Sequence, residues 1–420
     1  MNKLLLTLLV SFLSGALFSQ NYTISGTIKD GSNGEDAPFV TVRVKELSGV
    51  GTNSNEYGFY SITLEKGNYT IVYSSFGFKT IEKPIELTEN IALDIELEMD
   101  AQNIEEVTVS AKKENENLTK TDGSTIEIDM KTLKEIPTFG GEPDIVRVAQ
   151  MNPGIKTAGE GNAGYYVRGG GLDQNLVLLD EAPVYNPSHM LGIFSVFNGD
   201  AVKSASVYKG GMSSEYGGRT SSVMDIRMKD GNSKKFNVSG GLGLIASRLT
   251  VEGPIVKNKG SFIISGRRSY ADIFLQLSDN ERFRNSTLYF YDLNLKANYK
   301  ITKKDKLFVS GYFGRDEFGY SDVFGMNWGN ATGTIRWNHI INEKLFSNTS
   351  VIYSNYDYKF IVGGDEGISI RSTINDINLK QDFTYFLNNN NKLKFGFNAI
   401  HHTIEPVSYT HLTLPTNDVV

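Results

Sequence analysis

Apolar and polar side chains alternate along much of the second half of the chain. Between residues 289 and 301 every odd position is Tyr, Leu, Ala or Ile, whereas all even positions except Phe290 are Asp, Asn or Lys. The alternation returns at residues 393–399, where Leu, Phe and Ala alternate with Lys, Gly and Asn. Successive side chains of a strand point to opposite faces. The pattern therefore predicts strands that have one apolar and one polar face.

About eight such strands are predicted in this region, near residues 237–253, 259–268, 288–301, 305–315, 330–341, 344–360, 367–386 and 391–402. Their connections alternate between short ones, at 303–305, 342–343 and 388–391, and long ones, at 269–287 and 316–329. This asymmetry is typical of antiparallel transmembrane β-barrels. A barrel that encloses a whole domain has about 22 strands. We therefore expect residues 232–406 to form a partial barrel, and the chain to be a fragment.

Aromatic residues are frequent in the predicted barrel strands. They include Tyr289, Phe290, Tyr291, Trp328, Trp337, Tyr353, Tyr356 and Tyr358. Rings of this kind form girdles at the two membrane interfaces of transmembrane barrels. We interpret them as interfacial or lipid-facing positions, with a sugar-stacking surface as the alternative.

The N-terminal quarter contains shorter strands. Residues 22–30, 39–47, 58–64, 68–76 and 91–99 are predicted strands separated by Gly, Asn and Asp turns, which indicates a small β-sandwich over residues 21–100. Residues 1–20 combine Lys3 with an apolar run and small residues, the pattern of a secretory signal peptide. An uncleaved membrane anchor is the alternative, but the apolar run is shorter than the ~20 residues that a spanning helix needs.

The segment from residue 123 to residue 231 has a different pattern of apolar residues and glycines. Short apolar strands at 175–179 and 205–208 alternate with glycine clusters, and a helix is predicted at 143–150. The whole is predicted to be a compact α/β domain. Arg168 and the three glycines after it lack the spacing of a phosphate-binding loop, so we interpret them as a turn.

Composition restricts the chemistry that is available. The chain has 420 residues, a formal net charge of −6 and no cysteine, which excludes disulfides, thiolate metal sites and cysteine nucleophiles. Basic residues form no cluster of the kind that binds nucleic acid. Asp180 and Glu181 are neighbours at a predicted strand end and so cannot act together as an acid–base pair. No histidine belongs to a zinc motif. We predict no enzymatic activity, no metal and no cofactor.

Residues 165–230 carry a series of short motifs. They comprise an Arg-Gly-Gly loop at 168–170, a hydrophobic strand ending in Asp180, Asp-Ala-Val-Lys-Ser at 200–204, Lys-Gly-Gly at 209–211 and Glu-Tyr-Gly-Gly-Arg at 215–219. This series resembles the plug domain of TonB-dependent outer-membrane receptors. The sandwich, through Gly26 to Asp30, NSNEYGFY at 53–60 and GNYTIVYSSFGF at 67–78, resembles the non-catalytic carboxypeptidase regulatory-like domain.

Residues 101–122 join these two domains and are mostly polar. Their first part is similar to a TonB box, a short extended segment that adds as a strand to the periplasmic protein TonB. The residues concerned are Ile104, Glu105, Glu106, Val107, Thr108 and Val109. An ordinary interdomain strand is the alternative interpretation.

The resemblance implies an outer-membrane receptor that imports a scarce or large nutrient, with its N-terminal domain in the periplasm. Its partners would be TonB with the inner-membrane energising complex, outer-membrane lipid, an extracellular ligand and a possible surface lipoprotein. Iron chelates, cobalamin, saccharides and peptides are all compatible ligands. Arg168 and Arg219 would contact carboxylates of the barrel wall. An outer loop of the plug would contribute ligand-binding residues, namely Asn186, Pro187, Ser188, His189 and Met190.

Other functions fit parts of the sequence. An exported surface-binding or adhesion protein would use the β-sandwich without active transport, and a secreted hydrolase would use it as an accessory domain. Residues 407–416, VSYTHLTLPT, break the strand pattern and resemble the translation of a sequencing adapter. We therefore expect residues 407–420 to be a non-native tail.

Overall fold

A computed structural model describes residues 21–100, 125–129, 142–159, 163–321, 323–363 and 368–410. The chain divides into two compact units. The first contains the N-terminal β-sandwich, and the second contains the central domain and most of the C-terminal sheet. The signal peptide and the TonB-box-like segment predicted above lie outside the described residues.

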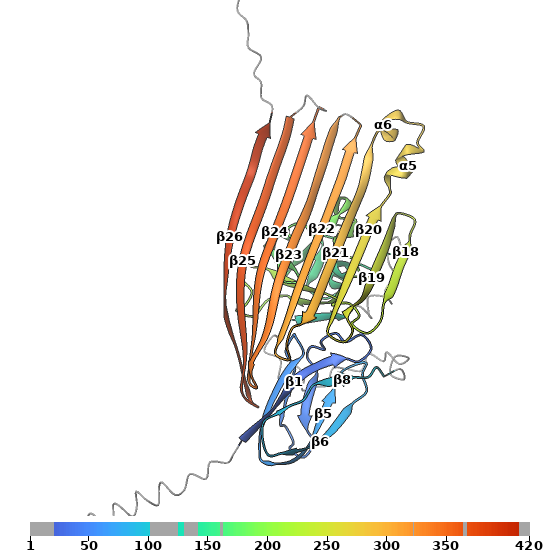
Figure 1. Ribbon diagram of the computed structural model, residues 1–420. Helices are drawn as coiled ribbons and strands as arrows, with labels where there is room; N and C mark the ends of the chain where they lie inside the picture. The colour runs from blue at the N-terminus through green and yellow to red at the C-terminus, as the bar shows by residue number, and fades with distance from the viewer. Residues whose placement is uncertain are drawn as a thin grey trace, which may run out of the picture. The chain divides into compact units, whose positions relative to one another are not determined.

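The N-terminal unit is the predicted sandwich of two sheets (Figure 1). One sheet consists of β1 (Asn21–Asp30), β4 (Phe59–Glu65), β7 (Ile91–Ala92) and β8 (Ile95–Leu97). The other consists of β2 (Thr41–Val44), β3 (Gly51–Asn53), β5 (Gly67–Ser74) and β6 (Ile81–Leu87). The sequence pattern did not predict β3 and β6. β6 is an edge strand in which Pro84 and three charged residues interrupt the apolar signal.

Two tyrosines form a polar contact inside the sandwich core. The hydroxyls of Tyr60 and Tyr73 lie 2.8 Å apart, and the Tyr60 hydroxyl donates to the Leu93 carbonyl. Burial raises the pKa of both hydroxyls, that of Tyr73 to about 12. The two rings meet edge to face at 5.5 Å. The rings thus add apolar area to the core while their hydroxyls keep hydrogen-bond partners.

The central domain is built around a five-stranded sheet in the order β13-β12-β17-β16-β9. Its strands are β9 (Thr125–Asp129), β12 (Asn175–Leu179), β13 (Ala182–Pro183), β16 (Val202–Tyr208) and β17 (Ser222–Met228). Smaller pieces surround this sheet: α4 (Ile145–Gln150), β10 (Ile155–Thr157), β11 (Tyr165–Val167), η3 (Leu172–Gln174), β14 (Ser188–His189), η4 (Met190–Gly192) and β15 (Phe194–Ser195). The predicted α/β class is therefore found.

Helix α4 ends at Gln150, as the sequence predicts, but begins at Ile145, two residues later than expected. The Asp144 carboxylate accepts hydrogen bonds from the amides of Val146 and Arg147, which makes Asp144 the N-cap. The other carboxylate oxygen accepts the amide of Ser195. The capping residue thereby ties the helix to β15 at the same time.

The C-terminal half forms one antiparallel sheet whose strands stand side by side from β18 to β26 (Figure 1). They are β18 (Asn237–Leu242), β19 (Ala246–Val256), β20 (Gly260–Ser269), β21 (Thr287–Lys300), β22 (Asp305–Tyr320), β23 (Phe324–Asn342), β24 (Leu345–Val362), β25 (Ile368–Asn388) and β26 (Asn391–Thr410). Helices α5 (Asp272–Gln276) and α6 (Glu281–Arg284) lie in the connection from β20 to β21. β18 and β26 are its two edges, so within the described residues the sheet is a partial barrel that is not closed.

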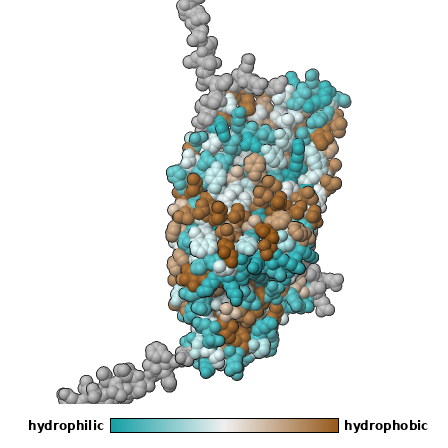
Figure 2. All heavy atoms as spheres, in the orientation of Figure 1, coloured by the Kyte–Doolittle hydropathy of each residue, from teal (hydrophilic) through white to brown (hydrophobic). Residues whose placement is uncertain are grey.

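The two faces of this sheet differ as the alternation predicts. On the outer face, large apolar side chains such as Leu293, Leu295, Val309 and Ile335 are exposed. Figure 2 shows apolar residues gathered across the middle of this face. On the inner face the polar residues Asp292, Asn294 and Lys296 are buried. Such a sheet presents one face that suits lipid and another that packs against polar groups.

Three details of the predicted strands are wrong. The segment 237–253 is two strands, because residues 243–245 form the turn between β18 and β19, so the sheet has nine strands. The long connection expected at 316–329 is largely strand, since β22 and β23 pair as far as Tyr320 and Phe324. β26 extends to Thr410, eight residues past the predicted end of this strand at His402.

The expected outward orientation of the aromatic residues is also wrong for part of the set. Phe290 is fully buried and stacks on His189 of the central domain. Trp328 donates its indole N–H to the Ser188 carbonyl. Both residues occupy even positions and so share the inner face with Asp292 and Lys296. In contrast, Trp337 and Tyr353 are exposed on the outer face.

None of the helices in the described part of the chain is long and apolar enough to span a membrane.

Candidate functional site

The hairpin turn between β12 and β13 carries two adjacent carboxylates into the inner face of the sheet. Leu179 pairs with Ala182, which leaves Asp180 and Glu181 as a two-residue loop with φ of 45° and 75°. Two-residue hairpins with both φ values positive usually carry Asn-Gly or Asp-Gly. Glutamate has no such preference, so the backbone is strained at Glu181. Both side chains are buried.

Asp180 is held by a lysine from strand β21. The Lys296 ammonium lies 2.9 Å from the Asp180 carboxylate and 2.9 Å from the Asp230 carboxylate. It also donates to the Met228 carbonyl. Burial alone would raise the pKa of Asp230, but Lys296, followed by Lys306, outweighs it and holds that pKa well below its usual range. Lys296 therefore joins the sheet to the turn and to the end of the central domain.

Glu181 is held by cations from neighbouring strands. Its carboxylate lies 3.5 Å from the Arg336 guanidinium of β23 and accepts a hydrogen bond from Asn348 of β24. Burial alone would raise the pKa of Glu181. The charges of Lys380, Arg336 and Arg227 outweigh burial and hold that pKa well below its usual range. Glu181 is thus ionised, and the turn reaches strands β23, β24 and β25 together.

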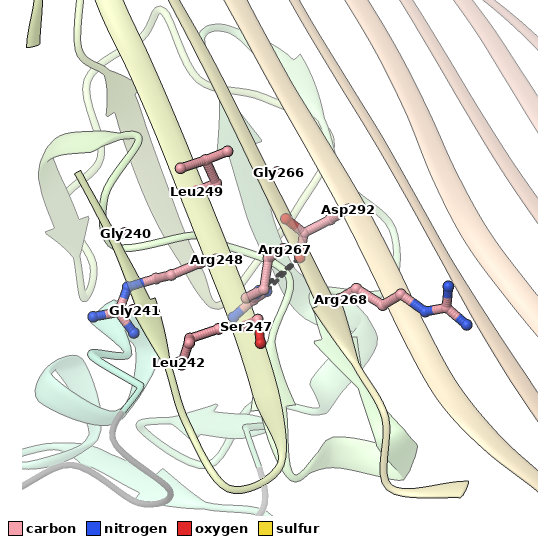
Figure 3. Close-up of a pocket in the computed structure, with 10 residues that line it drawn as sticks. All are labelled: Gly240, Gly241, Leu242, Ser247, Arg248, Leu249, Gly266, Arg267, Arg268 and Asp292. Atoms are coloured by element: carbon pink, nitrogen blue, oxygen red, sulfur yellow. Dashed lines mark hydrogen bonds and ion pairs between the residues drawn. The ribbon is translucent and has the colours of Figure 1, made fainter. Parts of the chain in front are cut away.

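A second charged cluster lies beside helix α4. Arg267 of β20 binds the Asp292 carboxylate of β21 at 2.7 Å, and its guanidinium is 3.8 Å from Glu142. Glu142 also pairs with Arg248 of β19 at 2.9 Å, and Arg248 in turn binds Asp200. Figure 3 shows Arg267 reaching Asp292 from the neighbouring strand. These contacts connect three strands of the sheet with the residues just before the N-terminus of α4.

Beside this cluster is a cavity of about 680 Å³ between β18, β19 and β20. Gly240, Leu242 and Leu249 line part of it, together with Arg248 and Arg267 (Figure 3). Its lining includes residues of β18, an edge strand of the sheet. Two of the arginines that line it, Arg248 and Arg267, also pair with the central domain.

The residues predicted to bind a ligand lie against the inner face of the sheet. Asn330 donates to the Asn186 carbonyl, and the carbonyls of Pro187 and Ser188 accept the Val196 amide and the Trp328 indole. Asp316 accepts from both the His189 ring and the Met190 amide. His189 and Met190 are buried, whereas the next residue, Leu191, is exposed. Their role in binding a ligand stays a prediction.

The two arginines predicted to contact the barrel occupy turns of the central domain. Arg168 is exposed, has a φ of 48° and lies beside Gly210. Arg219 is half-buried, donates to the Gly218 carbonyl and lies over the ring of Tyr185, 5.9 Å from its centroid. The pairing of these arginines with barrel carboxylates stays a prediction. Residues 104–109, predicted to contact TonB, lie outside the described residues.

In the described ranges no group of three or more His, Asp or Glu side chains is arranged to hold a metal ion. The charged groups on the inner face are instead paired with one another across the interface between the central domain and the sheet.

Two family profiles match the chain. Residues 119–223 match the TonB-dependent Receptor Plug Domain. The chain carries a TonB-dependent receptor plug domain. Residues 24–109 match the CarboxypepD_reg-like domain, in agreement with the resemblance of the sandwich. The central domain is accordingly the plug, and the nine-stranded sheet against which it packs is the partial barrel.

Several solved structures of outer-membrane receptors are similar to parts of the chain, all at low sequence identity. A mutant of the ferric enterobactin receptor PfeA from Pseudomonas aeruginosa is 13% identical, with a TM-score of 0.46, over 70% of this chain and 59% of that one. The siderophore receptor PirA from Acinetobacter baumannii is 15% identical, with a TM-score of 0.49, over 67% and 48%. BauA, the ferric preacinetobactin receptor of Acinetobacter baumannii, is 14% identical, with a TM-score of 0.48, over 70% and 50%.

The chain spans between 48% and 59% of the length of these three structures. No curated protein sequence matches it. The plug-domain profile and these three structures describe receptors, not enzymes.

Sequence reasoning missed the charged residues that attach the plug. The signal was present in β21, where Asp292 and Lys296 stand on the polar face of a strand whose other face is apolar. Glu142, Asp180 and Glu181 lie outside any periodic strand. Their hydrogen-bonded or ion-paired partners on the sheet are 106 to 167 residues away, namely Arg248, Lys296, Arg336 and Asn348. Only the fold brings them together.

Proposed function

We propose that the chain is the plug-bearing part of an energy-coupled importer of the outer membrane. A single observation carries this proposal: the plug is attached to the polar face of an amphipathic sheet through buried ion pairs. The opposite face of the same sheet is apolar and exposed. A domain attached in this way closes a pore and can still be moved, because its attachment is polar rather than a continuous apolar core.

The energy for that movement comes from TonB in this proposal. Residues 104–109 add as a strand to TonB in the periplasm, where main-chain hydrogen bonds supply the affinity. Force on this segment acts first on the N-terminal part of the plug. Within the plug, Glu142 with its partners Arg248 and Arg267 is the described ion-pair cluster nearest to that segment in the sequence. Force applied from the periplasm would therefore act on this cluster before it acts on the other ion pairs.

The nutrient is scarce or large, and it reaches the plug from outside. The exposed Leu191 of the plug and the outer ends of the barrel strands form its first contacts. The N-terminal sandwich lies in the periplasm. Transport by the full-length gene product is the activity proposed for this chain together with the barrel strands that complete the wall.

Deletion of residues 104–109 from the full-length gene tests this function. We expect cells to lose uptake of one member of a panel of labelled iron chelates, cobalamin, oligosaccharides and peptides, while surface binding of that compound is retained. A deletion of six residues from the polar stretch 112–122 is the matched control and keeps uptake. Unchanged uptake after deletion of residues 104–109 would favour a surface-binding protein without active transport.

A further inference from the structure

The outer loop of the plug has an unusual backbone that needs an anchor. Met190, Leu191 and Gly192 follow His189 and have φ of 49°, 58° and 106°. Non-glycine residues rarely adopt this left-handed region, and they keep it only where the surroundings enforce it. Leu191 is 55% exposed, so its own packing does not provide the restraint. The anchor must lie at the buried residues on its N-terminal side.

That anchor is His189 together with Asp316 of β22. The Nδ1 atom of His189 lies 2.6 Å from one Asp316 oxygen, and the Met190 amide donates to the other oxygen at 2.7 Å. The imidazole also stacks on Phe290 of β21, with ring centroids 4.2 Å apart and planes 9° from parallel. One carboxylate of the barrel thus fixes two consecutive residues at the start of the loop.

The second ring nitrogen of His189 faces another carboxylate. Its Nε2 atom lies 3.4 Å from Asp292 of β21 and 3.4 Å from the Tyr312 hydroxyl of β22. A neutral imidazole has one N–H and can donate to one side only, whereas an imidazolium donates to both. Two carboxylates at opposite ends of the ring therefore fit the doubly protonated form.

The surrounding charges agree with this protonation state. Asp292 shares its charge with Arg267 of β20, and Glu142 of the plug faces the same guanidinium. Asp292 therefore has a cationic partner besides His189. The ion pair of Asp316 with the ring, in contrast, requires that the ring be protonated. Burial alone would lower the pKa of His189, but Asp316 and Asp292 outweigh it and raise that pKa.

We propose that His189 is a positioning residue, held as an imidazolium between Asp316 and Asp292, and that its deprotonation releases the outer loop of the plug from β21 and β22. The role of this release in transport rests on the proposed function, but the clamp itself does not. Because the folded pKa is raised, the stabilisation is complete below the ordinary histidine value of about 6.5 and is lost as the pH rises through the higher folded value.

The protonation state can be measured directly in the full chain in detergent micelles. The chain has five histidines, so ¹⁵N-histidine labelling gives a resolvable set of ring signals. We expect one histidine to remain an imidazolium at pH 7.5, and this signal to disappear in His189→Gln. In Asp316→Asn the titration midpoint of the His189 ring should fall by at least about one pH unit, since a carboxylate is replaced by a neutral amide. A neutral His189 ring at pH 7.5 would overturn the proposal.

Amide hydrogen exchange then tests the release. After correction for intrinsic rates, exchange at residues 190–193 should increase at least about tenfold between pH 7 and pH 10 in the unmodified chain. In His189→Gln it should be fast at both values. His339→Gln is the matched control, because His339 pairs with Asp305 at 2.7 Å without contacting the plug. It should behave as the unmodified chain does.

Exchange at residues 190–193 that stays slow across the whole titration of His189 would contradict the release. Neither measurement uses a ligand or TonB. A failure of the uptake experiment therefore removes the proposed transport function and leaves the clamp standing, whereas a failure of these two measurements removes the clamp alone.

Discussion

Single residues hold the plug through charges that are expensive to bury alone. A buried carboxylate loses its hydration, and it is tolerated because cations and amide groups replace the lost water. Asp180 and Glu181 satisfy this condition with partners from different strands. Their left-handed turn adds backbone strain. A turn sequence selected only for stability would place glycine at the second position.

Removal of the Glu181 charge should loosen the plug. Glu181→Gln removes the carboxylate that lies 3.5 Å from the buried Arg336 guanidinium, and we expect the free energy of plug unfolding to fall by about 3 kcal/mol. Urea titration followed by hydrogen exchange of the plug amides measures this change. Glu317→Gln, which breaks a half-exposed pair with Arg315, is the control and should cost about 1 kcal/mol or less.

Glu181 should also make the stability of the plug depend on pH under acidic conditions. Because the pKa of Glu181 is lowered, its contribution is complete above the ordinary glutamate value and is lost as the pH falls through the lower folded value. Plug stability in the unmodified chain should therefore fall more steeply than in Glu181→Gln as the solution becomes strongly acidic. Parallel acid titrations of the two proteins would contradict the ionised state of Glu181.

At the scale of elements, strands with two distinct faces were the most predictable feature. β21 was predicted to within one residue at each end, because its alternation is nearly complete. The ends of β22 and β23 were missed, since residues 316–329 contain three glycines and four aromatic residues in irregular order, and only the pairing between the two strands makes them regular. The sequence also indicated which face of β21 is polar, but not what that face contacts.

The outer face of β21 should tolerate charge only near its end. Leu295→Lys places an ammonium in the middle of the exposed apolar band, and in lipid vesicles we expect it to destabilise the folded barrel by about 2 to 4 kcal/mol. Ile301→Lys, just past the last residue of β21, should cost about 1 kcal/mol or less. Urea unfolding in vesicles gives both values. Equal costs at the two positions would mean that the apolar band does not face lipid.

At the scale of the whole molecule, the order of domains was predicted from the sequence, and the attachment between them was not. The sandwich, plug and barrel strands each have a local pattern of strands or turns. The segment predicted to bind a ligand illustrates the difference. His189 was expected at an accessible loop, and the structure buries it against Asp316, which is 127 residues away. No local pattern records such a pairing.

The central claim is that the plug closes the barrel and must move for transport. The 420 residues contain no cysteine, so an introduced pair has no competing thiol among them. The Asn198 side chain of the plug donates to the Ser265 hydroxyl of β20 at 2.9 Å, and both residues are fully buried. The double variant Asn198→Cys/Ser265→Cys would therefore join the plug to the wall.

The control disulfide joins two neighbouring barrel strands without the plug. Ala297→Cys/Val309→Cys serves this purpose, because the two residues are paired across β21 and β22. Both double variants are prepared in the full-length gene and assayed in oxidised and reduced cells for uptake of the compound identified in the panel. The single-cysteine variants show whether either substitution alone affects transport.

The measurement is the uptake rate of the oxidised Asn198→Cys/Ser265→Cys variant. We predict that uptake is abolished while surface binding persists, that reduction restores it, and that the Ala297→Cys/Val309→Cys variant transports in both states. Undiminished uptake through a plug that is demonstrably cross-linked to β20 would contradict the account.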